Sequence, residues 1–479
     1  MTDPRTADAN AIDARVFPST ARRGSQCGQL KLGDLRATEL TEQFGSPLYV
    51  VDEDAARARA REIREALQAE AARIGTAATV YYASKAFLCV EVARWMVDEG
   101  LAIDVASGGE LAVALAAGVD PAVIGFHGNN KSVAEIERAV SVGVGTIIID
   151  SEIETGRIAA AARAAGRRQR VRLRVNSGVH ASTHDFLATS HEDQKFGQPL
   201  SEAPRLVAAI LAEDSLEFVG LHCHIGSQIF ATDGFRESAR RLLGVYPALA
   251  ELAGAPIPEL NLGGGFGIAY TSAQAEEAPD VAVIARELAD IVAETSAEVG
   301  VPIPKLAFEP GRSVIGQSGI TLYTVGTTKS VRLAGSDAAA DPADLGASER
   351  LYVSVDGGMS DNARPALYGA DYQVRIANRV SEAAPALVRV VGKHCESGDI
   401  VVQRDFLPGD VQPGDTLAVA ATGAYCWSLA SNYNYVPRPA VVAVRSGEAR
   451  LIVRGQTEDE LVAQSVTGDE TTLQNGATK

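Results

Sequence analysis

The chain has 479 residues, of which 46% are hydrophobic and 22% charged, and its formal net charge is −17. This composition is ordinary for a globular protein, and the length favours two domains over one. The acidic balance and the lack of a basic tract argue against nucleic acid and anionic membranes as partners, although a local cluster of donors could still bind an anionic small molecule.

The start of the chain and its cysteines bear on the compartment. Residues 1–25 contain no apolar core of a signal peptide, and no apolar run reaches membrane-spanning length. The five cysteines are scattered without CxxC spacing, which argues against a disulfide framework or a structural zinc site. We therefore expect a cytoplasmic protein that begins with a mobile tail over residues 1–25.

Short apolar runs and helical segments alternate through the first two thirds of the chain. After a strand at 47–51 and a helix at 52–73, strands are predicted near residues 79–84, 103–106, 123–127, 146–149, 171–175, 218–223, 259–262 and 305–308. Helices are predicted between them at 91–98, 109–117, 132–142, 152–164, 202–212, 236–253 and 281–299. Eight such units predict an α/β fold, a TIM-like (β/α)8 barrel over residues 49–312, with a doubly wound open sheet as the alternative.

After residue 312 the pattern changes to strands separated by Gly, Pro and Asp turns. Strands are predicted over residues 321–325, 351–355, 372–377, 386–391, 416–420, 440–445 and 451–453. Residues 313–479 are therefore predicted to form a C-terminal β-rich domain, a β-barrel or sandwich, against which an N-terminal segment (26–48) packs. The polar, Ala-rich stretch 334–348 is expected to be a mobile loop.

A lysine ends the first predicted barrel strand, in the sequence Tyr82-Ala83-Ser84-Lys85-Ala86-Phe87. The C-terminal ends of barrel strands form the face that carries active sites in this fold. An amine in that place can form a Schiff base with an aldehyde cofactor. The alternative is a solvated lysine at a strand end.

Two motifs follow the last two predicted barrel strands. The glycine run Gly263-Gly264-Gly265 lets backbone N–H groups approach a phosphate, and Glu309-Pro310-Gly311-Arg312 adds a cation and a carboxylate. Barrels often bind phosphate with these two loops. The alternatives are a simple turn for the glycines and a surface ion pair between Glu309 and Arg312.

Two histidines, His222 and His224, end the sixth predicted barrel strand and share one face by the two-residue period. Such a pair could bind a metal, but no third ligand with zinc-like spacing accompanies it, so we expect no metal site. Hydrogen-bonded core histidines are the alternative. A flat ring stacked on a cofactor suits His224, and Ser227 could donate to a phosphate.

The β-rich domain contains three further groups of polar and aromatic residues. They are His394-Cys395-Glu396-Ser397-Gly398-Asp399, Gly423-Ala424-Tyr425-Cys426-Trp427 and Arg364-Pro365-Ala366-Leu367-Tyr368. The first combines a thiol with carboxylates, and the last combines a cation with a phenol. From the residues alone, a structural role remains the favoured interpretation of each group.

Taken together, these motifs resemble the fold-type III pyridoxal-phosphate-dependent decarboxylases, the family of bacterial diaminopimelate decarboxylase and eukaryotic ornithine decarboxylase. The motifs Tyr-Ala-x-Lys-Ala, His-x-Gly-Ser, Gly-Gly-Gly-Phe, Glu-Pro-Gly-Arg and Cys-Glu-Ser-x-Asp all occur, and the resemblance spans about residues 48–435. It implies a pyridoxal 5'-phosphate cofactor and a homodimer with shared active sites.

The resemblance also implies residue roles. Lys85 forms the Schiff base, His224 stacks on the ring, Glu309 pairs with the pyridine nitrogen, and Cys395 donates a proton from the other subunit. Cofactor binding falls to Lys85, His224, Ser227, Gly263, Gly264, Gly265, Glu309, Gly311, Arg312 and Tyr425. Substrate binding falls to Arg312, Arg364, Tyr368, Glu396 and Tyr425.

Glu309 favours decarboxylation over racemisation, because the related alanine racemases are expected to carry an arginine there. Arg364 and Tyr368 resemble the residues found at these places in the diaminopimelate branch of the family. This resemblance implies decarboxylation of meso-2,6-diaminopimelate to L-lysine and CO2, the last step of lysine biosynthesis. Residues 176–197 resemble the mobile active-site loop of this branch. The alternatives are a decarboxylase of ornithine, lysine, arginine or carboxynorspermidine on the same fold, and a non-catalytic homologue that only binds the cofactor.

Overall fold

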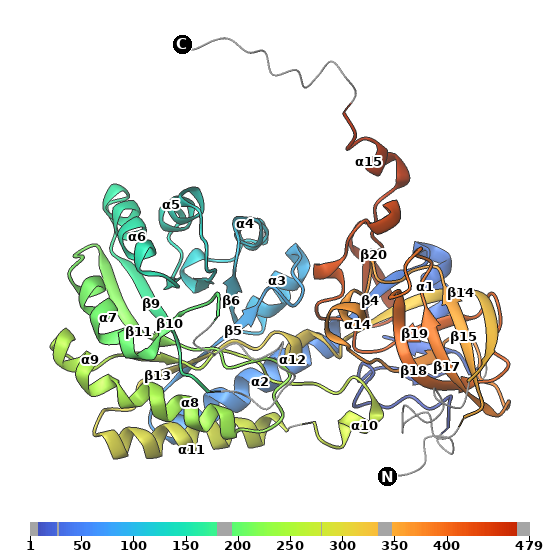
Figure 1. Ribbon diagram of the computed structural model, residues 1–479, viewed down its shortest axis with the longest axis horizontal. Coiled ribbons are helices and arrows are strands. Elements are labelled where there is room, and N and C mark those ends of the chain that lie inside the picture. Colours follow the sequence, from blue (N-terminus) through green and yellow to red (C-terminus); the bar gives the residue numbers. More distant parts are fainter. Residues whose placement is uncertain (1–7, 26–27, 180–193, 279, 334–346, 467–479) are drawn as a thin grey trace.

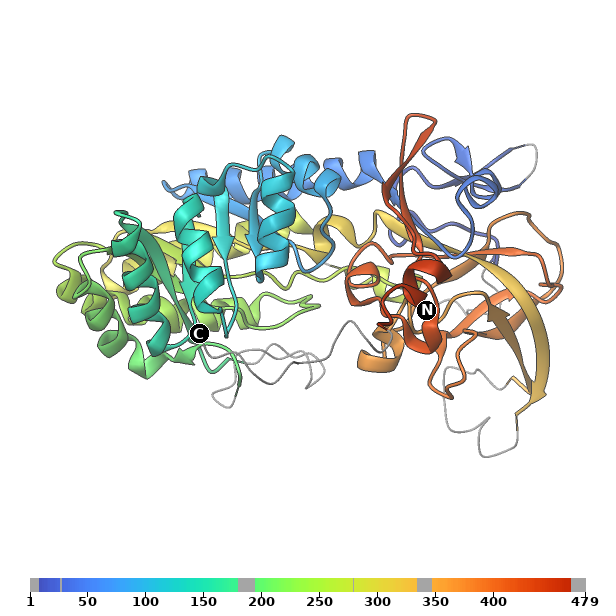
Figure 2. The same cartoon turned by 90° about the horizontal axis from the view of Figure 1, so that it is seen from above.

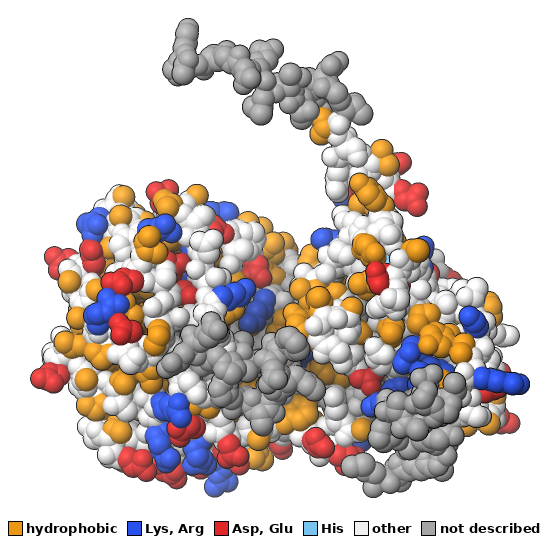
Figure 3. Space-filling view, viewed as in Figure 1, with side chains coloured by type: hydrophobic (Ala, Val, Ile, Leu, Met, Phe, Trp, Pro, Cys, Tyr) orange, Lys and Arg blue, Asp and Glu red, His pale blue; other side chains and the backbone are white. Residues whose placement is uncertain are grey.

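The computed structural model describes residues 8–25, 28–179, 194–278, 280–333 and 347–466. Two lobes lie side by side along the longest axis of the molecule (Figure 1, Figure 2). One is a barrel of strands surrounded by helices, and the other is rich in strands. Acidic and basic side chains lie interspersed over the face seen in Figure 3. No helix among the described residues is both long and apolar enough to cross a bilayer.

The first lobe is a closed parallel barrel, as predicted. Each strand pairs in parallel with the next, and β13 returns to pair with β5, which closes the ring. The residues that form the strands are mostly apolar and buried on both faces, as parallel barrels require. The strands are β5 (Ala78–Ala83), β6 (Ala102–Val105), β7 (Ile124–Phe126), β8 (Thr146–Ile149), β9 (Gln169–Asn176), β11 (Leu216–His222), β12 (Glu259–Asn261) and β13 (Lys305–Phe308).

Helices surround this barrel, and most of them bury one apolar face. In α5 the Ser132 side chain accepts from the Glu135 N–H, Glu135 caps Ser132 in return, and Gly143 ends the helix in the left-handed conformation. The segment 236–253, predicted as one helix, forms two helices, because the helix is interrupted at Val245. The helices are α2 (Glu53–Arg73), α3 (Val90–Asp98), α4 (Gly108–Ala116), α5 (Val133–Val142), α6 (Glu152–Ala164), α7 (Ala203–Leu211), α8 (Asp233–Gly244), α9 (Tyr246–Ala253), α10 (Ser272–Ala275), α11 (Val281–Val299) and α12 (Arg312–Ile315).

The second lobe is built on a mixed sheet in the order β18-β17-β15-β14-β4-β20-β21, with β19 pairing with β14 and β16. The predicted β-rich domain is therefore confirmed. Its elements are β14 (Gly319–Arg332), β15 (Glu349–Val355), α14 (Arg364–Tyr368), β16 (Val374–Ile376), β17 (Pro385–Val391), β18 (Ile400–Pro408), β19 (Thr416–Val419), β20 (Ala440–Arg445), β21 (Glu448–Val453) and α15 (Glu458–Val462).

One strand of this lobe, β18, was not predicted. Its middle carries Gln403, Arg404 and Asp405, which interrupt the apolar pattern on which a prediction would rest. In the fold Asp405 is satisfied locally, because its Oδ2 accepts from the Val374 N–H at 2.8 Å and pairs with Arg375 at 2.9 Å. A polar strand centre is tolerated where neighbouring elements supply its partners.

The strand β4 (Leu48–Asp52) lies in the second sheet, although the sequence analysis placed residue 49 at the start of the barrel. β4 pairs antiparallel with β14 and parallel with β20. All five of its residues are buried. An apolar run this short predicts a strand but does not indicate which sheet it joins.

The described part of the N-terminal segment is packed against the second lobe. It contains β1 (Arg22–Arg23), β2 (Leu30–Leu32), β3 (Leu35–Arg36) and α1 (Ala37–Phe44). Val16 and Phe17 are fully buried in a core shared with Leu322 and Val442. An Arg23 Nη1–H group donates to the Ile376 carbonyl at 2.7 Å. The prediction of a mobile tail is therefore wrong for residues 8–25, because two apolar residues anchor a segment too short to show a periodic pattern.

Parts of three predictions lie outside the described residues. They are residues 1–7 of the predicted tail, residues 334–346 of the predicted loop and residues 180–193 of the predicted active-site loop.

Candidate active site

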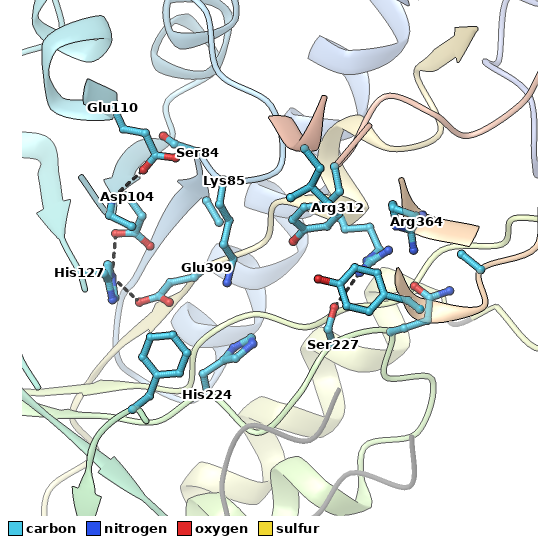
Figure 4. Close-up of a pocket in the computed structure, with 18 of the residues that line it drawn as sticks. Ser84, Lys85, Asp104, Glu110, His127, His224, Ser227, Glu309, Arg312 and Arg364 are labelled. Atoms are coloured by element: carbon cyan, nitrogen blue, oxygen red, sulfur yellow. Dashed lines mark hydrogen bonds and ion pairs between the residues drawn. The ribbon is translucent and has the colours of Figure 1, made fainter. Parts of the chain in front are cut away.

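A cavity of about 560 Å³ opens at the C-terminal ends of the barrel strands, where the barrel meets the second lobe. This is the face that carries active sites in such barrels. Both lobes contribute to its walls (Figure 4). The lining side chains include Ser84, Lys85, Asp104, Glu110, His127, Arg174, Phe196, His222, His224, Ser227, Gln228, Tyr270, Gln274, Glu309, Arg312, Arg364, Tyr368, Asp371 and Tyr425.

Lys85 follows β5 and extends its side chain into this cavity (Figure 4). The loop that carries it is fixed to both neighbouring strand ends. The Ala83 N–H donates to the Pro310 carbonyl at 3.0 Å, and the Ser84 N–H donates to the Asp104 carbonyl at 3.1 Å. The amine is therefore presented from a rigid support and remains accessible to a bound molecule, as covalent attachment requires.

Glu309 follows β13, the strand that pairs with β5, so it lies beside Lys85 (Figure 4), and it is surrounded by hydrogen-bonding groups. Asn261 Nδ2 donates to Oε1 at 2.6 Å, His222 Nε2 lies 3.2 Å from Oε2, and His127 Nε2 lies 3.2 Å from Oε1. Burial raises the pKa of Glu309, but the two histidines outweigh it and hold the pKa well below its usual range. The carboxylate is therefore ionised and suited to pair with a protonated ring nitrogen.

The two histidines around Glu309 differ in charge. Burial lowers the pKa of His222 to about 4, so this ring is neutral. Burial also lowers the pKa of His127, but Glu309 and Asp104 outweigh it and raise the pKa to about 9, so this ring is cationic. The ligand atoms of His127, His222 and Glu309 lie within 4.8 Å of one another, a spacing that could also hold a metal ion. The 3.2 Å contact of His222 with Glu309 is a hydrogen bond, and the 3.2 Å contact of the cationic His127 with Glu309 is an ion pair.

His224 presents a neutral ring to the cavity. The Gly264 N–H donates to its Nδ1 at 3.3 Å. Burial, then the positive charges of Lys85 and Arg174, lower its pKa well below the usual range. A neutral, flat ring fixed by its backbone partner is suited to stacking against an aromatic cofactor.

A recess of about 50 Å³ adjoins the main cavity and has the character of an anion site. Arg312 Nη2 donates to Ser227 Oγ at 2.9 Å, and Arg312 Nη1 donates to the Tyr270 hydroxyl. Within the described part of the chain, the buried Arg312 Nε has no hydrogen-bond partner, so it is available to a ligand. The recess is lined by Ala83, Lys85, His224, Ser227, Gly265, Phe266, Glu309, Gly311, Arg312 and Tyr425.

The glycine run allows the loops to approach one another closely. A Cβ on Gly265 would lie 2.2 Å from the Gly226 carbonyl oxygen, and one on Gly264 would lie 2.0 Å from the Glu309 carbonyl oxygen. Gly263 and Gly264 are buried and do not line either cavity, whereas Gly265 and Gly311 line the recess. The first two glycines therefore support the site, and the other two face the ligand.

The second lobe closes the cavity from the opposite side. The Tyr425 N–H donates to the Ala86 carbonyl at 2.7 Å, which ties this loop to the one carrying Lys85. The Arg364 side chain is buried, donates to the Tyr372 hydroxyl at 2.5 Å and lies 4.5 Å from the centre of the Tyr270 ring. Tyr368 lines the cavity and is half exposed.

Cys395 and Glu396 are not brought into the cavity. Both are exposed in the turn before β18, and neither lines the cavity in the described structure. Asp399 holds the turn by accepting from the His394 N–H at 2.7 Å, and the Cys395 N–H donates to Asn434 Oδ1 at 3.2 Å. In the described part of a single chain, neither side chain is therefore in place to act in the cavity.

Sequence reasoning missed several functional candidates. Asp104, His127, Arg174 and Tyr270 all line the cavity, and none was singled out. The first three lie at the C-terminal ends of β6, β7 and β9. That position was the available signal, because polar residues at the ends of successive barrel strands converge on one face.

The residues present fit pyridoxal 5'-phosphate. Lys85 offers an amine to its aldehyde, and Glu309 offers an ionised carboxylate to its ring nitrogen. The recess offers Ser227, Arg312 with its unpartnered Nε, and the close approach of Gly265 to its phosphate. These groups lie around a single space with the spread of donors that such a molecule needs.

Comparisons with known proteins agree with this chemistry. The family described as pyridoxal-dependent decarboxylase, pyridoxal binding domain, matches residues 59–316. Diaminopimelate decarboxylase of Mycobacterium tuberculosis is 48% identical over 457 residues, covering 94% of this chain and 98% of its own. The enzyme of that name from Bacillus subtilis is 41% identical over 449 residues, covering 93% and 97%. The structure of diaminopimelate decarboxylase from M. jannaschii in complex with L-lysine aligns with a TM-score of 0.83 at 30% identity, covering 94% and 98%.

Proposed function

The chain belongs to the pyridoxal-dependent decarboxylase family, and we propose that it converts meso-2,6-diaminopimelate to L-lysine and CO2, the last step of lysine biosynthesis. The observation that carries the proposal is one cavity in which Lys85 and Glu309 face each other while Arg364 closes the wall. The names of the relatives that match over nearly the whole chain support the same substrate.

Each side chain has a distinct task in this proposal. Pyridoxal 5'-phosphate, when bound, supplies an aldehyde for the substrate amine and a ring that accepts the electrons released with CO2. Lys85 holds the aldehyde until the substrate amine replaces it, and Glu309 holds a proton on the ring nitrogen, which increases the electron demand of the ring. His224 covers one ring face and fixes its orientation. Loss of the carboxylate is thus favoured by positioning and charge.

The phosphate is proposed to lie in the recess. Ser227 and Arg312 supply donors there, and Gly265 and Gly311 allow the backbone to come close. Tyr425 lies beside them, because the Arg312 guanidinium is 4.7 Å from the centre of its ring. Gly263 and Gly264 act indirectly by holding the loop that carries Gly265.

Selection among substrates is proposed to depend on the distal group. Diaminopimelate carries a second amino-acid head, whose carboxylate needs a cation. Arg364, Arg312 and Tyr368 lie on the side of the cavity formed with the second lobe, so a guanidinium and a phenol can hold that carboxylate. A substrate with only an amine at that end, such as ornithine, would meet the positive charge of Arg364 and be disfavoured.

The substrate assignment is tested by incubating the purified protein with pyridoxal 5'-phosphate and meso-2,6-diaminopimelate and measuring L-lysine and CO2. We expect stoichiometric formation of both, and little turnover of ornithine, lysine or arginine at the same concentration. Preferred turnover of ornithine would place the chain in another branch of the family. Cofactor binding without turnover of any amino acid would identify a non-catalytic homologue.

We further propose a homodimer in which Cys395 of the partner subunit donates the proton that replaces CO2, while Glu396 of the partner subunit holds the distal ammonium group. This is supported by the exposure of both residues outside the cavity, on a turn that Asp399 and Asn434 hold rigidly. A thiol is a competent general acid when a positioned group holds it at the reacting carbon.

Mixing two inactive variants tests the shared site. Lys85→Ala and Cys395→Ala subunits, unfolded and refolded together, should regain roughly a quarter of the wild-type decarboxylation rate. Half of the dimers are then mixed, and each mixed dimer has one site with both native residues. The control is each variant refolded alone. Mixtures that stay as inactive as the separate variants would exclude a shared site.

A cytoplasmic location belongs to the same proposal. Cys89, Cys223, Cys395 and Cys426 are free thiols. Free thiols suit a reducing compartment.

A further inference from the structure

A buried pair, Asp104 and His127, lies behind the carboxylate of Glu309. Asp104 is in β6 and His127 follows β7. His127 Nε2 lies 3.2 Å from Asp104 Oδ1 and 3.2 Å from Glu309 Oε1, so one ring nitrogen bridges two carboxylates (Figure 4). The roles proposed above for the reaction do not use either residue.

Among the described residues, His127 is the only cation within ion-pair distance of Asp104, although the charge of Arg172 also stabilises this carboxylate. Its side chain is nearly fully buried, and neither carboxylate oxygen has a regular hydrogen bond within the described residues. A Cβ on Gly125 would lie 2.3 Å from Asp104 Oδ1, so glycine leaves the space that this carboxylate occupies. A buried carboxylate is costly unless a cation accompanies it, and His127 is the cation at hand.

The charges around Glu309 imply a place for a second cation. Burial and the charge of Glu309 raise the pKa of Asp104 to about 6, so above that pH Asp104 and Glu309 together carry two negative charges, and His127 carries one positive charge. The remaining negative charge can stabilise a protonated ring nitrogen beside Glu309. If Asp104 were uncharged, His127 and the ring nitrogen would compete for the single carboxylate of Glu309, and one of them would lose its proton.

We propose that Asp104, acting through His127, keeps the ring nitrogen of the cofactor protonated. Asp104 and His127 act as positioning residues: they set the charge around Glu309, and neither needs to touch the reacting atoms. The inference rests on the proposed function, in which Glu309 faces the ring nitrogen. Glu309 alone is insufficient to keep the ring nitrogen protonated, because the cationic His127 already neutralises part of its negative charge.

Other charged groups near His127 have partners of their own. Arg172 pairs with Glu259 at 2.7 Å, and Arg174 lies 4.0 Å from Asp150. Glu110 accepts from the Ala106 N–H at 2.6 Å. Lys85 lies beside Glu309 at the end of β5, where it is expected to be bound to the cofactor aldehyde, and His222 is neutral. Arg174 also acts on Glu309 by its charge, but it stays unchanged in the variants below, so differences among them report on Asp104 and His127.

The test compares three variants by nitrogen NMR of pyridoxal 5'-phosphate labelled at the ring nitrogen and bound to the protein. In Asp104→Asn, the pH at which the ring nitrogen loses its proton should fall by on the order of one to two pH units. The variant lacks one negative charge near the ring nitrogen, and the protein between them partly screens that charge. In His127→Gln, two carboxylates remain, so the pH of deprotonation of the ring nitrogen should not fall. In the double variant, one carboxylate and no competing cation remain, so this pH should return close to the wild-type value.

This pattern separates charge compensation from a structural role. A purely structural role predicts that the double variant is at least as impaired as Asp104→Asn, and that result would overturn the proposal, as would an unchanged titration in Asp104→Asn. The control is Glu154→Gln, which removes another buried carboxylate, paired with Lys131 at 3.0 Å outside the cavity. Its ring-nitrogen titration should match wild type. Failure of the wild-type protein to bind the cofactor would instead refute the proposed function.

Discussion

The Lys85→Ala variant is expected to lose on the order of 10³-fold or more of its decarboxylation rate, because it lacks the only amine that lines the cavity in the described structure. The variant should still bind pyridoxal 5'-phosphate, since Ser227, Arg312 and Glu309 remain, but without the yellow absorbance of an imine. The rate of lysine formation and the absorption spectrum of the loaded protein measure the two effects separately.

A matched control is Lys305→Ala, which removes an exposed lysine from β13 on the same barrel. Lys305 begins its strand, at the end opposite the cavity, so this variant should keep both the rate and the spectrum. Retention of the yellow band in Lys85→Ala, at wild-type intensity and sensitive to borohydride, would mean that another amine holds the aldehyde.

The Arg364→Ala variant is expected to raise the KM for meso-2,6-diaminopimelate on the order of 10- to 100-fold, with a smaller change in kcat. A buried guanidinium that pairs with a substrate carboxylate contributes a charge-assisted hydrogen bond of that magnitude. Tyr372 and Tyr270 hold the Arg364 side chain in place, so little freedom is lost on binding. Steady-state kinetics with the cofactor at saturation give both constants.

Two further variants sharpen this result. Arg364→Lys keeps the charge but lacks the planar fork, so its KM should fall between those of the wild type and Arg364→Ala. Arg389→Ala removes an arginine that also lies over a tyrosine, Tyr352 at 5.8 Å, but outside the cavity, and its KM should be unchanged. Wild-type kinetics in Arg364→Ala would contradict the proposed substrate contact and reopen the choice among basic amino acids.

The barrel was predictable because its signals are local and repeated. Runs such as Thr146–Ile149 are mostly apolar and buried on both faces, and helical segments follow them. Once the strands are assigned, the ends of β5 and β13 place Lys85 and Glu309 on one face of the barrel. The chemistry of the two residue types then suggests a cofactor with an aldehyde and a basic ring nitrogen.

Features that depend on distant partners were not predictable. The five residues of β4 do not indicate that they pair with β14 and β20 rather than with the barrel. The bridge from Asp104 through His127 to Glu309 joins residues far apart in sequence, and only the closed barrel brings them together. Cys395 lies outside the cavity of its own chain, and no local pattern in the residues indicates this position; only the family resemblance implied a role for it in another subunit.

The central claim is that the Lys85 amine forms the covalent bond to the cofactor in this cavity. The most direct measurement is borohydride reduction of the wild-type protein loaded with pyridoxal 5'-phosphate, followed by proteolysis and mass spectrometry of the peptides. We predict that the peptide containing Lys85 carries the reduced phosphopyridoxyl group in nearly all molecules. Modification of a different lysine, with the Lys85 peptide unmodified, would contradict the account.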